Sequence, residues 1–298
     1  MKIKKAGLVL VTSALVSIGA MVSYAGATGI QGVDAYNTQS QTAGTTTDQT
    51  AGTTVDSSQA AALINGFATK LNASQNFGVN EKISMNMNMT YGVKSESTGT
   101  ISERYSIING DNAHITINVT EYENGVLTGT ESSEQYYIKD GVNHKAYEVK
   151  NGAVTDSQVL QAMNLRENYF PIKYHGNETV TIENGEFVVR GYMLKEDYAN
   201  SNTIGGEDVL SSLGLTDDVT KEMNDALTNM PYELHFNTSG DLTFMQIDMS
   251  GLINGTMSIF KAIYGEEAAG LEVNGQMIYQ AAFNLDPSQT FAVPYYLN

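Results

Sequence analysis

The side chains that could do chemistry in this chain are few and scattered. Its four histidines, His114, His144, His175 and His235, stand alone in the sequence, and no two have the spacing of a metal-ligating pair. His235 alternates with apolar neighbours, so we expect its ring on the solvent side of a strand. Surface or polar-face positions are expected for all four. The sequence therefore predicts no metal site.

Two pairs of neighbouring carboxylates, Glu121/Glu123 and Asp217/Asp218, have the residue types needed for general acid and base catalysis. In a chain with 33 acidic residues such pairs also arise as solvated surface charge or at helix ends. No nucleophile-elbow serine, phosphate-binding glycine loop or dinucleotide fingerprint accompanies them. We therefore assign no catalytic residue and expect neither enzyme activity nor a cofactor.

Methionine offers a different chemistry, the binding of apolar molecules. Apolar side chains recur at every second position in three segments, so each segment presents one apolar strand face. The candidate ligand-binding residues on these faces are Met85, Met87, Met89, Tyr91, Met245, Ile247, Met249, Met277, Tyr279 and Phe283. In a curved sheet the faces converge on one concave surface, and methionine adapts to irregular ligands. The alternative is that helices fill this concavity and the methionines are ordinary core.

Strands must position most of these residues. Strict alternation between apolar and small polar residues from Ile83 to Tyr91 predicts a half-buried antiparallel strand. Asn-Gly and Asp-Gly pairs between successive runs predict tight hairpins. The further strands expected are Thr100–Ile108, Ala113–Tyr122, Glu134–Lys139, Asn143–Val149, Glu178–Glu183, Glu186–Leu194, Tyr232–Asn237, Leu242–Met249 and Leu271–Leu285.

Four segments have helical character. Apolar residues at three- and four-residue spacing predict an amphipathic helix over Ser57–Leu71. A short helix is expected over Ser157–Arg166, and a helical insertion over Gly206–Asn229 that ends at Pro231. The segment Gly255–Gly265 also has helical character. The fold class expected is α+β and mostly β.

The N-terminus predicts export. Lys2, Lys4 and Lys5 precede an apolar stretch, and Ala25-Gly26-Ala27 fits signal-peptidase cleavage after Ala27 or Ala25. Residues 1–27 are therefore expected to be a signal peptide. Residues 28–56, rich in Thr, Gly, Gln and Ala, are expected to be a disordered spacer, and residues 57–298 a single domain. The processed chain should be secreted, associated with the cell envelope or free, and should not span a membrane.

Charge and cysteine content limit the partners. Removing residues 1–27 takes away three lysines and no acid, so the net charge falls from −17 to −20. Such a chain is repelled by phosphate backbones, so nucleic acid is not an expected partner. The absence of cysteine excludes disulfides, thiolate metal sites and a lipidated N-terminal cysteine.

The overall pattern resembles a known family. An amphipathic helix precedes long alternating strands, and Pro231 to Met249 forms a strand-turn-strand unit. The closing residues Gln276 to Asn284 with Val293-Pro294 fit a last strand and tail. Over residues 57–298 the chain resembles the LolA/LppX-like lipoprotein-carrier fold, in particular uncharacterised secreted members from Gram-positive bacteria. The resemblance implies a strongly curved antiparallel sheet, a half-barrel wrapped around a few helices, whose concave side holds lipid or acyl chains in better-known relatives.

Three functions remain open. The first is a non-catalytic envelope protein that binds a lipid-like or other apolar ligand on the concave face. The second is a structural or interaction module with a filled core that recognises another envelope protein. The third is a glycan-binding module, because 17 tyrosines include the aromatic pairs Tyr136-Tyr137, Tyr169-Phe170 and Tyr295-Tyr296.

Overall fold

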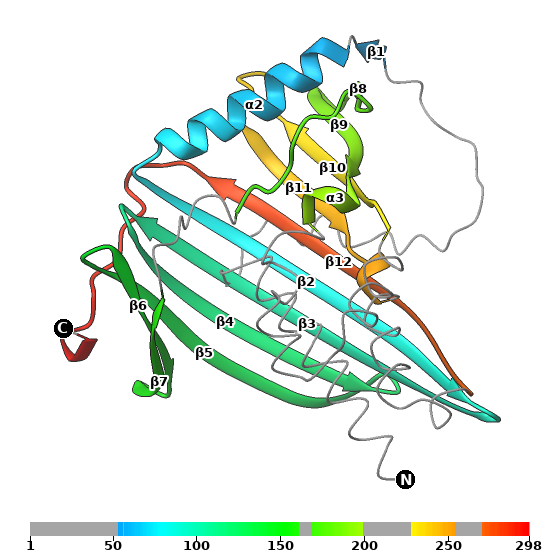
Figure 1. Cartoon of the computed structure of the whole chain (residues 1–298), viewed down its shortest axis with the longest axis vertical. Coiled ribbons are helices and arrows are strands. Elements are labelled where there is room, and N and C mark those ends of the chain that lie inside the picture. Colours follow the sequence, from blue (N-terminus) through cyan, green and yellow to red (C-terminus); the bar gives the residue numbers. More distant parts are fainter. Residues whose placement is uncertain (1–52, 56, 161–168, 199–227, 254–269, 298) are drawn as a thin grey trace.

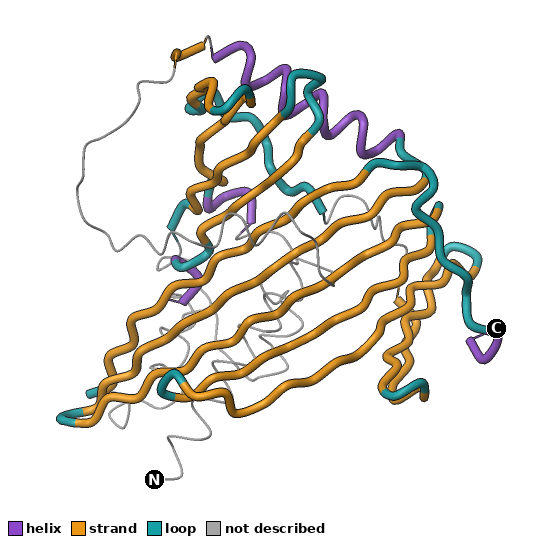
Figure 2. Tube along the Cα trace, turned by 180° about the vertical axis from the view of Figure 1, so that it is seen from behind, coloured by secondary structure: helices purple, strands orange, loops and turns teal. Residues whose placement is uncertain are grey.

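One antiparallel sheet organises the protein (Figure 1). The computed structural model describes residues 53–55, 57–160, 169–198, 228–253 and 270–297. The sheet has 12 strands in the order β1-β8-β9-β10-β11-β12-β2-β3-β4-β5-β6-β7, and every neighbouring pair is antiparallel. It curves along its width and does not close into a barrel (Figures 1 and 2). The expected mostly β fold with a curved sheet and few helices is confirmed.

Two meanders form the sheet, and the last strand joins them. The first runs from β2 to β7 and the second from β8 to β11, while β12 pairs with both β11 and β2. The strands are β1 Thr53–Val55, β2 Asn76–Tyr91, β3 Lys94–Asn109, β4 Asn112–Glu123, β5 Val126–Asp140, β6 Asn143–Lys150, β7 Ala153–Leu160, β8 Thr179–Glu183, β9 Glu186–Met193, β10 Met230–Phe236, β11 Leu242–Asp248 and β12 Leu271–Asn284.

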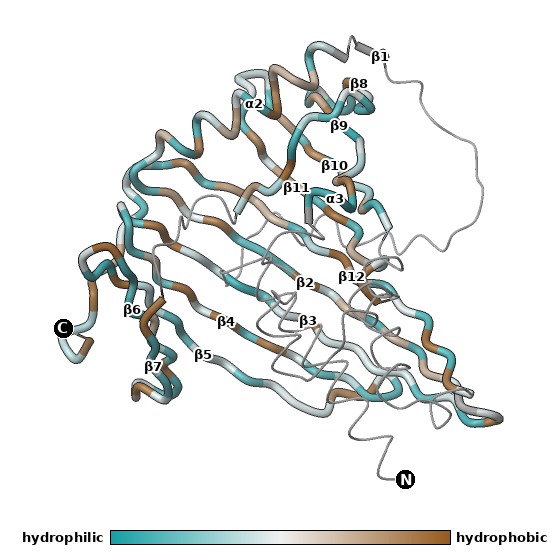
Figure 3. Tube along the Cα trace, viewed as in Figure 1, coloured by the Kyte–Doolittle hydropathy of each residue, from teal (hydrophilic) through white to brown (hydrophobic). Residues whose placement is uncertain are grey.

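Tight turns fix the register of the long hairpins. Asn124 and Gly125, and likewise Asn184 and Gly185, both have positive φ, as two-residue type I′ hairpin loops require. Hydrophobic and hydrophilic residues are interspersed along the strands of the sheet (Figure 3). Since the side-chain period is two, this register places one set of side chains on the inner face and the other on the outer face.

Helix α2 (Ser57–Ala73) lies along one end of the sheet (Figure 1). Ala60, Ile64, Phe67 and Leu71 are buried at four- and three-residue spacing, so one stripe of the helix faces the core. Beside this stripe, Lys70 forms a 2.6 Å ion pair with Asp241 in the β10–β11 turn. The expected N-terminal helix is therefore present. The shorter helices are α3 (Lys195–Tyr198) and the 3-10 turn η3 (Tyr295–Leu297).

One expected helix is wrong. The helix expected over Ser157–Arg166 is instead strand as far as Leu160, because Asn151 and Gly152 form a hairpin turn that pairs β7 with β6. The expected spacer over residues 28–56 contains β1, which pairs with β8. The expected signal peptide and residues 28–52 lie outside the described residues, as do residues 161–168. The segments 199–227 and 254–269, on which further helices were expected, also lie outside them. Pro231, expected to end a helix, lies in β10 opposite Tyr192.

Candidate ligand-binding face

The inner face of the sheet carries apolar side chains from ten adjacent strands, from β8 to β6 in the order of the sheet. The register carries this lining from strand to strand: Met85 of β2 lies opposite Met277 of β12, and Tyr279 of β12 lies opposite Ile247 of β11. Ile247 in turn lies opposite Tyr232 of β10. All five are buried in one hydrophobic cluster. The predicted convergence of the methionine-bearing strand faces on one surface is therefore present.

Most of the ten candidate residues belong to this cluster. Seven are almost fully buried: Met85, Met87, Met245, Ile247, Met249, Met277 and Tyr279. Phe283 is partly buried and packs against the cluster, and Met89 is partly buried on the same face of β2. Tyr91 is the last residue of β2, and the structure does not describe its side chain. Ligand binding by these residues is a proposal.

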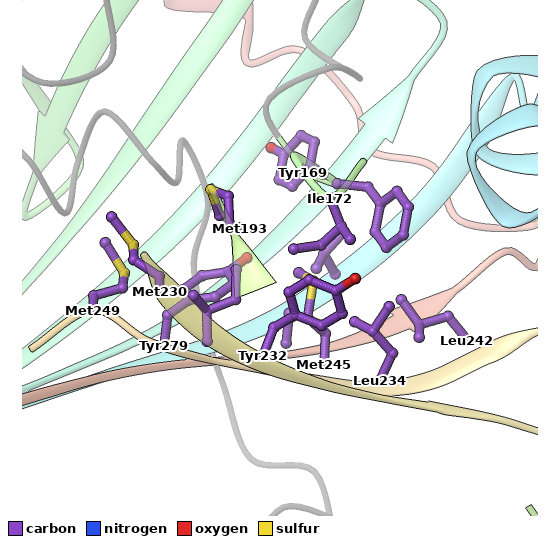
Figure 4. Packing of buried hydrophobic residues seen from close by; sticks show 14 of the residues in the cluster. Tyr169, Ile172, Met193, Met230, Tyr232, Leu234, Leu242, Met245, Met249 and Tyr279 are labelled. Carbon is purple, nitrogen blue, oxygen red and sulfur yellow. The ribbon is translucent and has the colours of Figure 1, made fainter. Parts of the chain in front are cut away.

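One part of the cluster was not among the predicted residues. It is contributed by β9, β10 and the segment after residue 168. Figure 4 shows Met193, Met230 and Tyr232 beside Met249 and Tyr279. Tyr169 and Ile172 face them from the segment that precedes β8 (Figure 4). The alternation from Met230 to Phe236 was visible in the sequence, so these strand residues could have been added on that basis.

Charged and hydroxyl side chains replace the apolar lining at β3. Glu81 of β2 lies opposite Arg104 of β3, and the two are only 4% and 6% exposed. The Tyr279 hydroxyl donates to Oε1 of Glu81 at 2.6 Å, whereas Oε2 has no hydrogen-bond partner. The Arg104 Nε donates to the Ser102 hydroxyl at 3.0 Å. The inner face thus changes from apolar on β2 to polar on β3.

Burial perturbs the protonation of this group. Loss of water raises the pKa of Glu81 to about 8, although the positive charge of Arg104 and the Tyr279 hydrogen bond act in the opposite direction. Burial likewise lowers the pKa of Arg104 and raises that of Tyr279. Tyr169, whose hydroxyl donates to Ser106 at 3.1 Å, also has a raised pKa because of burial. Burial therefore favours the neutral, protonated form of Glu81.

Aromatic side chains fill the end of the inner face that lies under α2. The Phe67 ring packs edge-on against Phe236 of β10, Phe283 of β12 and Phe170, with ring centroids 6.4, 5.1 and 5.0 Å apart. Phe77 packs edge-on against Tyr169 at 5.7 Å. Edge-to-face pairs at these distances are favourable beyond the area that they bury. At this end the helix packs directly against the sheet.

A charged network covers part of the outer face. Arg190 of β9 donates to Glu183 of β8 and to Glu233 of β10, each at 2.6 Å. The hydrogen bonds from Arg190 and Thr181 lower the pKa of Glu183 to about 2. His235 contacts Glu233 at 2.7 Å and Glu186 at 3.3 Å. Burial alone would lower the pKa of His235, but these two carboxylates outweigh it and raise the pKa.

The C-terminal segment covers another part of the outer face. The ring of Phe291 lies 5.6 Å from that of His114 and 6.3 Å from that of Tyr136, and the His114 and Tyr136 rings stack at 4.4 Å. The Tyr105 hydroxyl donates to Gln289 at 2.5 Å. Leu297 is buried in the same small cluster. This end of the chain is therefore fixed on the strands that it crosses.

The histidines do not gather into a site. His114, His175 and His235 each contact a carboxylate, Glu134, Asp197 and Glu233 respectively. His144 contradicts the expected surface position, since it is 1% exposed and its Nε2 lies 2.8 Å from the Asp111 carbonyl. Over the described ranges, no three His, Asp or Glu side chains are grouped so as to hold a metal ion.

The other chemical candidates are also dispersed. Glu121 and Glu123 are exposed on β4, and Asp217/Asp218 lies outside the described residues. Of the aromatic pairs considered for glycan binding, Tyr136-Tyr137 and Tyr169-Phe170 are buried, while Tyr295 and Tyr296 are exposed. No helix in the described part of the chain is long and apolar enough to cross a membrane.

Comparison with known proteins yields no family assignment. No protein-family model matches the chain, and no curated protein matches it. One solved structure that it resembles is a DUF1329 family protein from Desulfovibrio piger, with 8% sequence identity. That match covers 79% of this chain and 96% of the other, at a TM-score of 0.16. A similarity this weak supports no conclusion about function.

Proposed function

We propose that this chain is a secreted, non-catalytic protein of the cell envelope with a LolA/LppX-like fold. It binds a lipid-like or other apolar ligand on the concave inner face of its sheet. The observation that carries the proposal is the methionine-rich lining shared by β2, β11 and β12, with Met85, Met87, Met245, Met249 and Met277 on one face. Flexible thioether side chains suit an acyl chain of variable shape.

The end of this face away from α2 is the part best suited to a ligand. Met89 and Val273 lie opposite each other on β2 and β12, and both are only partly buried. Toward α2, by contrast, Phe67 and its three phenylalanine neighbours occupy the inner face. An apolar ligand would therefore lie along the strands beyond the aromatic group.

Native mass spectrometry of the processed protein from its natural source tests the proposal. We expect a bound lipid-like mass in the wild-type protein and its loss in the double variant Met89→Gln with Val273→Gln. The matched control, Met89→Leu with Val273→Ile, keeps the surface apolar and should retain the ligand. Both sites are partly buried, so near-native thermal unfolding curves can confirm folding. Spectra that show only empty wild-type protein would contradict the proposal.

The alternative function is a protein-interaction module with a filled core. The packing of Phe67 against β10, β12 and Phe170 favours it, because this is how a helix completes a core. The two functions differ in the effect of the inner-face variants. Binding of an envelope partner by such a module would not change in Met89→Gln with Val273→Gln.

A further inference from the structure

A separate pocket lies on the outer face, away from the methionine-rich lining. Its volume is about 500 Å³, and it opens over strands β8, β9, β10 and β11. Among the residues that line it are Asn177, Thr179, Arg190, Tyr192, Gln246 and Asp248. A volume in this range is adequate for a small organic ligand. Nothing in the inner-face proposal uses these residues.

The floor of the pocket is a row of polar side chains built by the strand register. Thr179 lies opposite Arg190, Arg190 opposite Glu233, and Glu233 opposite Gln246. The Arg190 guanidinium donates to both Glu233 and Glu183. Its charge is therefore neutralised within the protein, and the row offers a polar surface without a strong attraction for anions.

Several hydrogen-bonding atoms around the pocket make no bond with another described residue. Asp248 accepts a hydrogen bond from the Ser250 backbone through Oδ1, which leaves Oδ2 available. Gln246 accepts from Gln280 through Oε1, which leaves its amide NH₂ available. Asn177 and Thr179 are exposed at the margin. Both hydrogen-bond donors and hydrogen-bond acceptors are thus available around one opening.

An aromatic ring stands at the edge of this polar surface. Tyr192 is 50% exposed although it lies within β9, and it is opposite Pro231 of β10. Proline has a fixed backbone conformation, so this neighbour is rigid. A half-exposed tyrosine beside unengaged amides and a carboxylate offers one apolar face and several directional polar contacts.

We infer that this outer pocket binds an uncharged carbohydrate. Sugar hydroxyls both donate and accept hydrogen bonds, which matches the carboxylate of Asp248 and the amides of Gln246 and Asn177. The C–H face of a sugar ring can stack on Tyr192, as apolar surfaces do on aromatic rings. The internal pairing of Arg190 favours a neutral ligand, and the chain's net charge of −17 opposes an acidic one.

Saturation-transfer NMR and calorimetry with tetra-N-acetylchitotetraose, cellotetraose and maltotetraose test this inference on the processed chain. We expect saturable binding of at least one of these neutral tetrasaccharides. Tyr192→Ala should weaken it about tenfold, which corresponds to about 1.4 kcal/mol, a value in the range of one aromatic contact. Asp248→Asn, which keeps the size of the side chain, should also weaken binding because it changes an acceptor into a donor.

Tyr295→Ala is the matched control, since Tyr295 is 89% exposed and lies outside the pocket. It should leave binding unchanged. Gln246→Ala provides an independent variant in case Tyr192→Ala alters the fold of β9. Failure of all three sugars to bind at millimolar concentration would overturn the inference, as would equal binding by Tyr192→Ala.

Discussion

The Tyr279 hydroxyl donates a 2.6 Å hydrogen bond to Oε1 of Glu81, joining β12 to β2 across 198 positions of sequence. The other carboxyl oxygen of Glu81 is buried without a hydrogen-bond partner. An acid in this position is stable in its neutral form, which explains the direction of its pKa shift. This contact gives the inner face a pH-dependent element in addition to its apolar lining.

Stability should therefore fall with rising pH through Glu81. The pKa of this carboxyl is about 8 in the folded chain and near its ordinary value of 4.5 in the unfolded chain, so the folded state holds the proton more tightly. Its contribution is fully present below about pH 4.5 and is lost progressively up to about pH 8. Glu81→Gln should remove this dependence. Its free energy of unfolding should exceed that of the wild type by on the order of a few kcal/mol above about pH 8.

Urea unfolding of both proteins at pH 5 and pH 8.5 measures this difference. The wild type should lose more stability than Glu81→Gln between the two values, because the glutamine has no proton to release. Glu103→Gln serves as a control, since Glu103 is exposed on the outer side of β3. Parallel pH dependence in the wild type and Glu81→Gln would show that the carboxyl titrates normally.

His235 should likewise stabilise the outer face at low pH. Its pKa is raised because Glu233 and Glu186 outweigh the effect of burial. The stabilisation is fully present below about pH 6.5, the unfolded value, and is lost as pH rises through the higher folded pKa. Titration of the imidazole by NMR should give a pKa above 6.5. Glu186→Gln should lower that pKa, and an unchanged value would contradict the assigned contact.

Gly125→Ala should destabilise the β4–β5 hairpin by about 1 kcal/mol or more. Gly125 has φ of +77° in the turn after Asn124, a conformation that a Cβ atom disfavours. Gly66→Ala is the matched control, because Gly66 lies within α2 and a Cβ there meets no atom within 4 Å. That substitution should stabilise the chain by about 0.5–1 kcal/mol. Thermal unfolding of the two variants should therefore shift in opposite directions.

Phe67→Ala should lower the free energy of unfolding by about 3–5 kcal/mol, because it leaves a cavity among three phenylalanine rings. Val93→Ala is the comparison, since Val93 is fully exposed in the β2–β3 turn and should change stability by less than about 0.5 kcal/mol. Denaturant unfolding gives both values. A small effect of Phe67→Ala would mean that α2 is only loosely attached to the sheet.

Regular alternation and turn residues allowed most of the sheet to be predicted from the sequence. The strand from Leu242 and the long final strand were expected within one residue of their observed ends, because buried positions recur at every second residue in the larger part of β11 and in the second half of β12. The convergence of Met85, Met277 and Met245 also followed from this alternation once a curved sheet was assumed. Local pattern was sufficient wherever one face was apolar.

Other features depend on distant partners and could not be predicted in this way. The beginning of β2 was missed because Glu81 occupies an inner position that should be apolar, and its compensation comes from Tyr279 and Arg104. β7 was taken for a helix because only its pairing with β6 selects the extended form. The three residues of β1 are a strand solely through β8. The outer pocket combines residues from four strands and has no local signature.

The placement of β12 between β11 and β2 has a consequence for the order of assembly. Successive hairpins of β2 to β7 can form as soon as they are synthesised, because each strand pairs with its neighbour in sequence. The β2 backbone, however, keeps one side without a hydrogen-bonding partner until the last strand is made. An incomplete chain therefore exposes a long, methionine-bearing strand edge, which is a template for aggregation. Productive folding of the centre of the molecule must wait for its C-terminal strand.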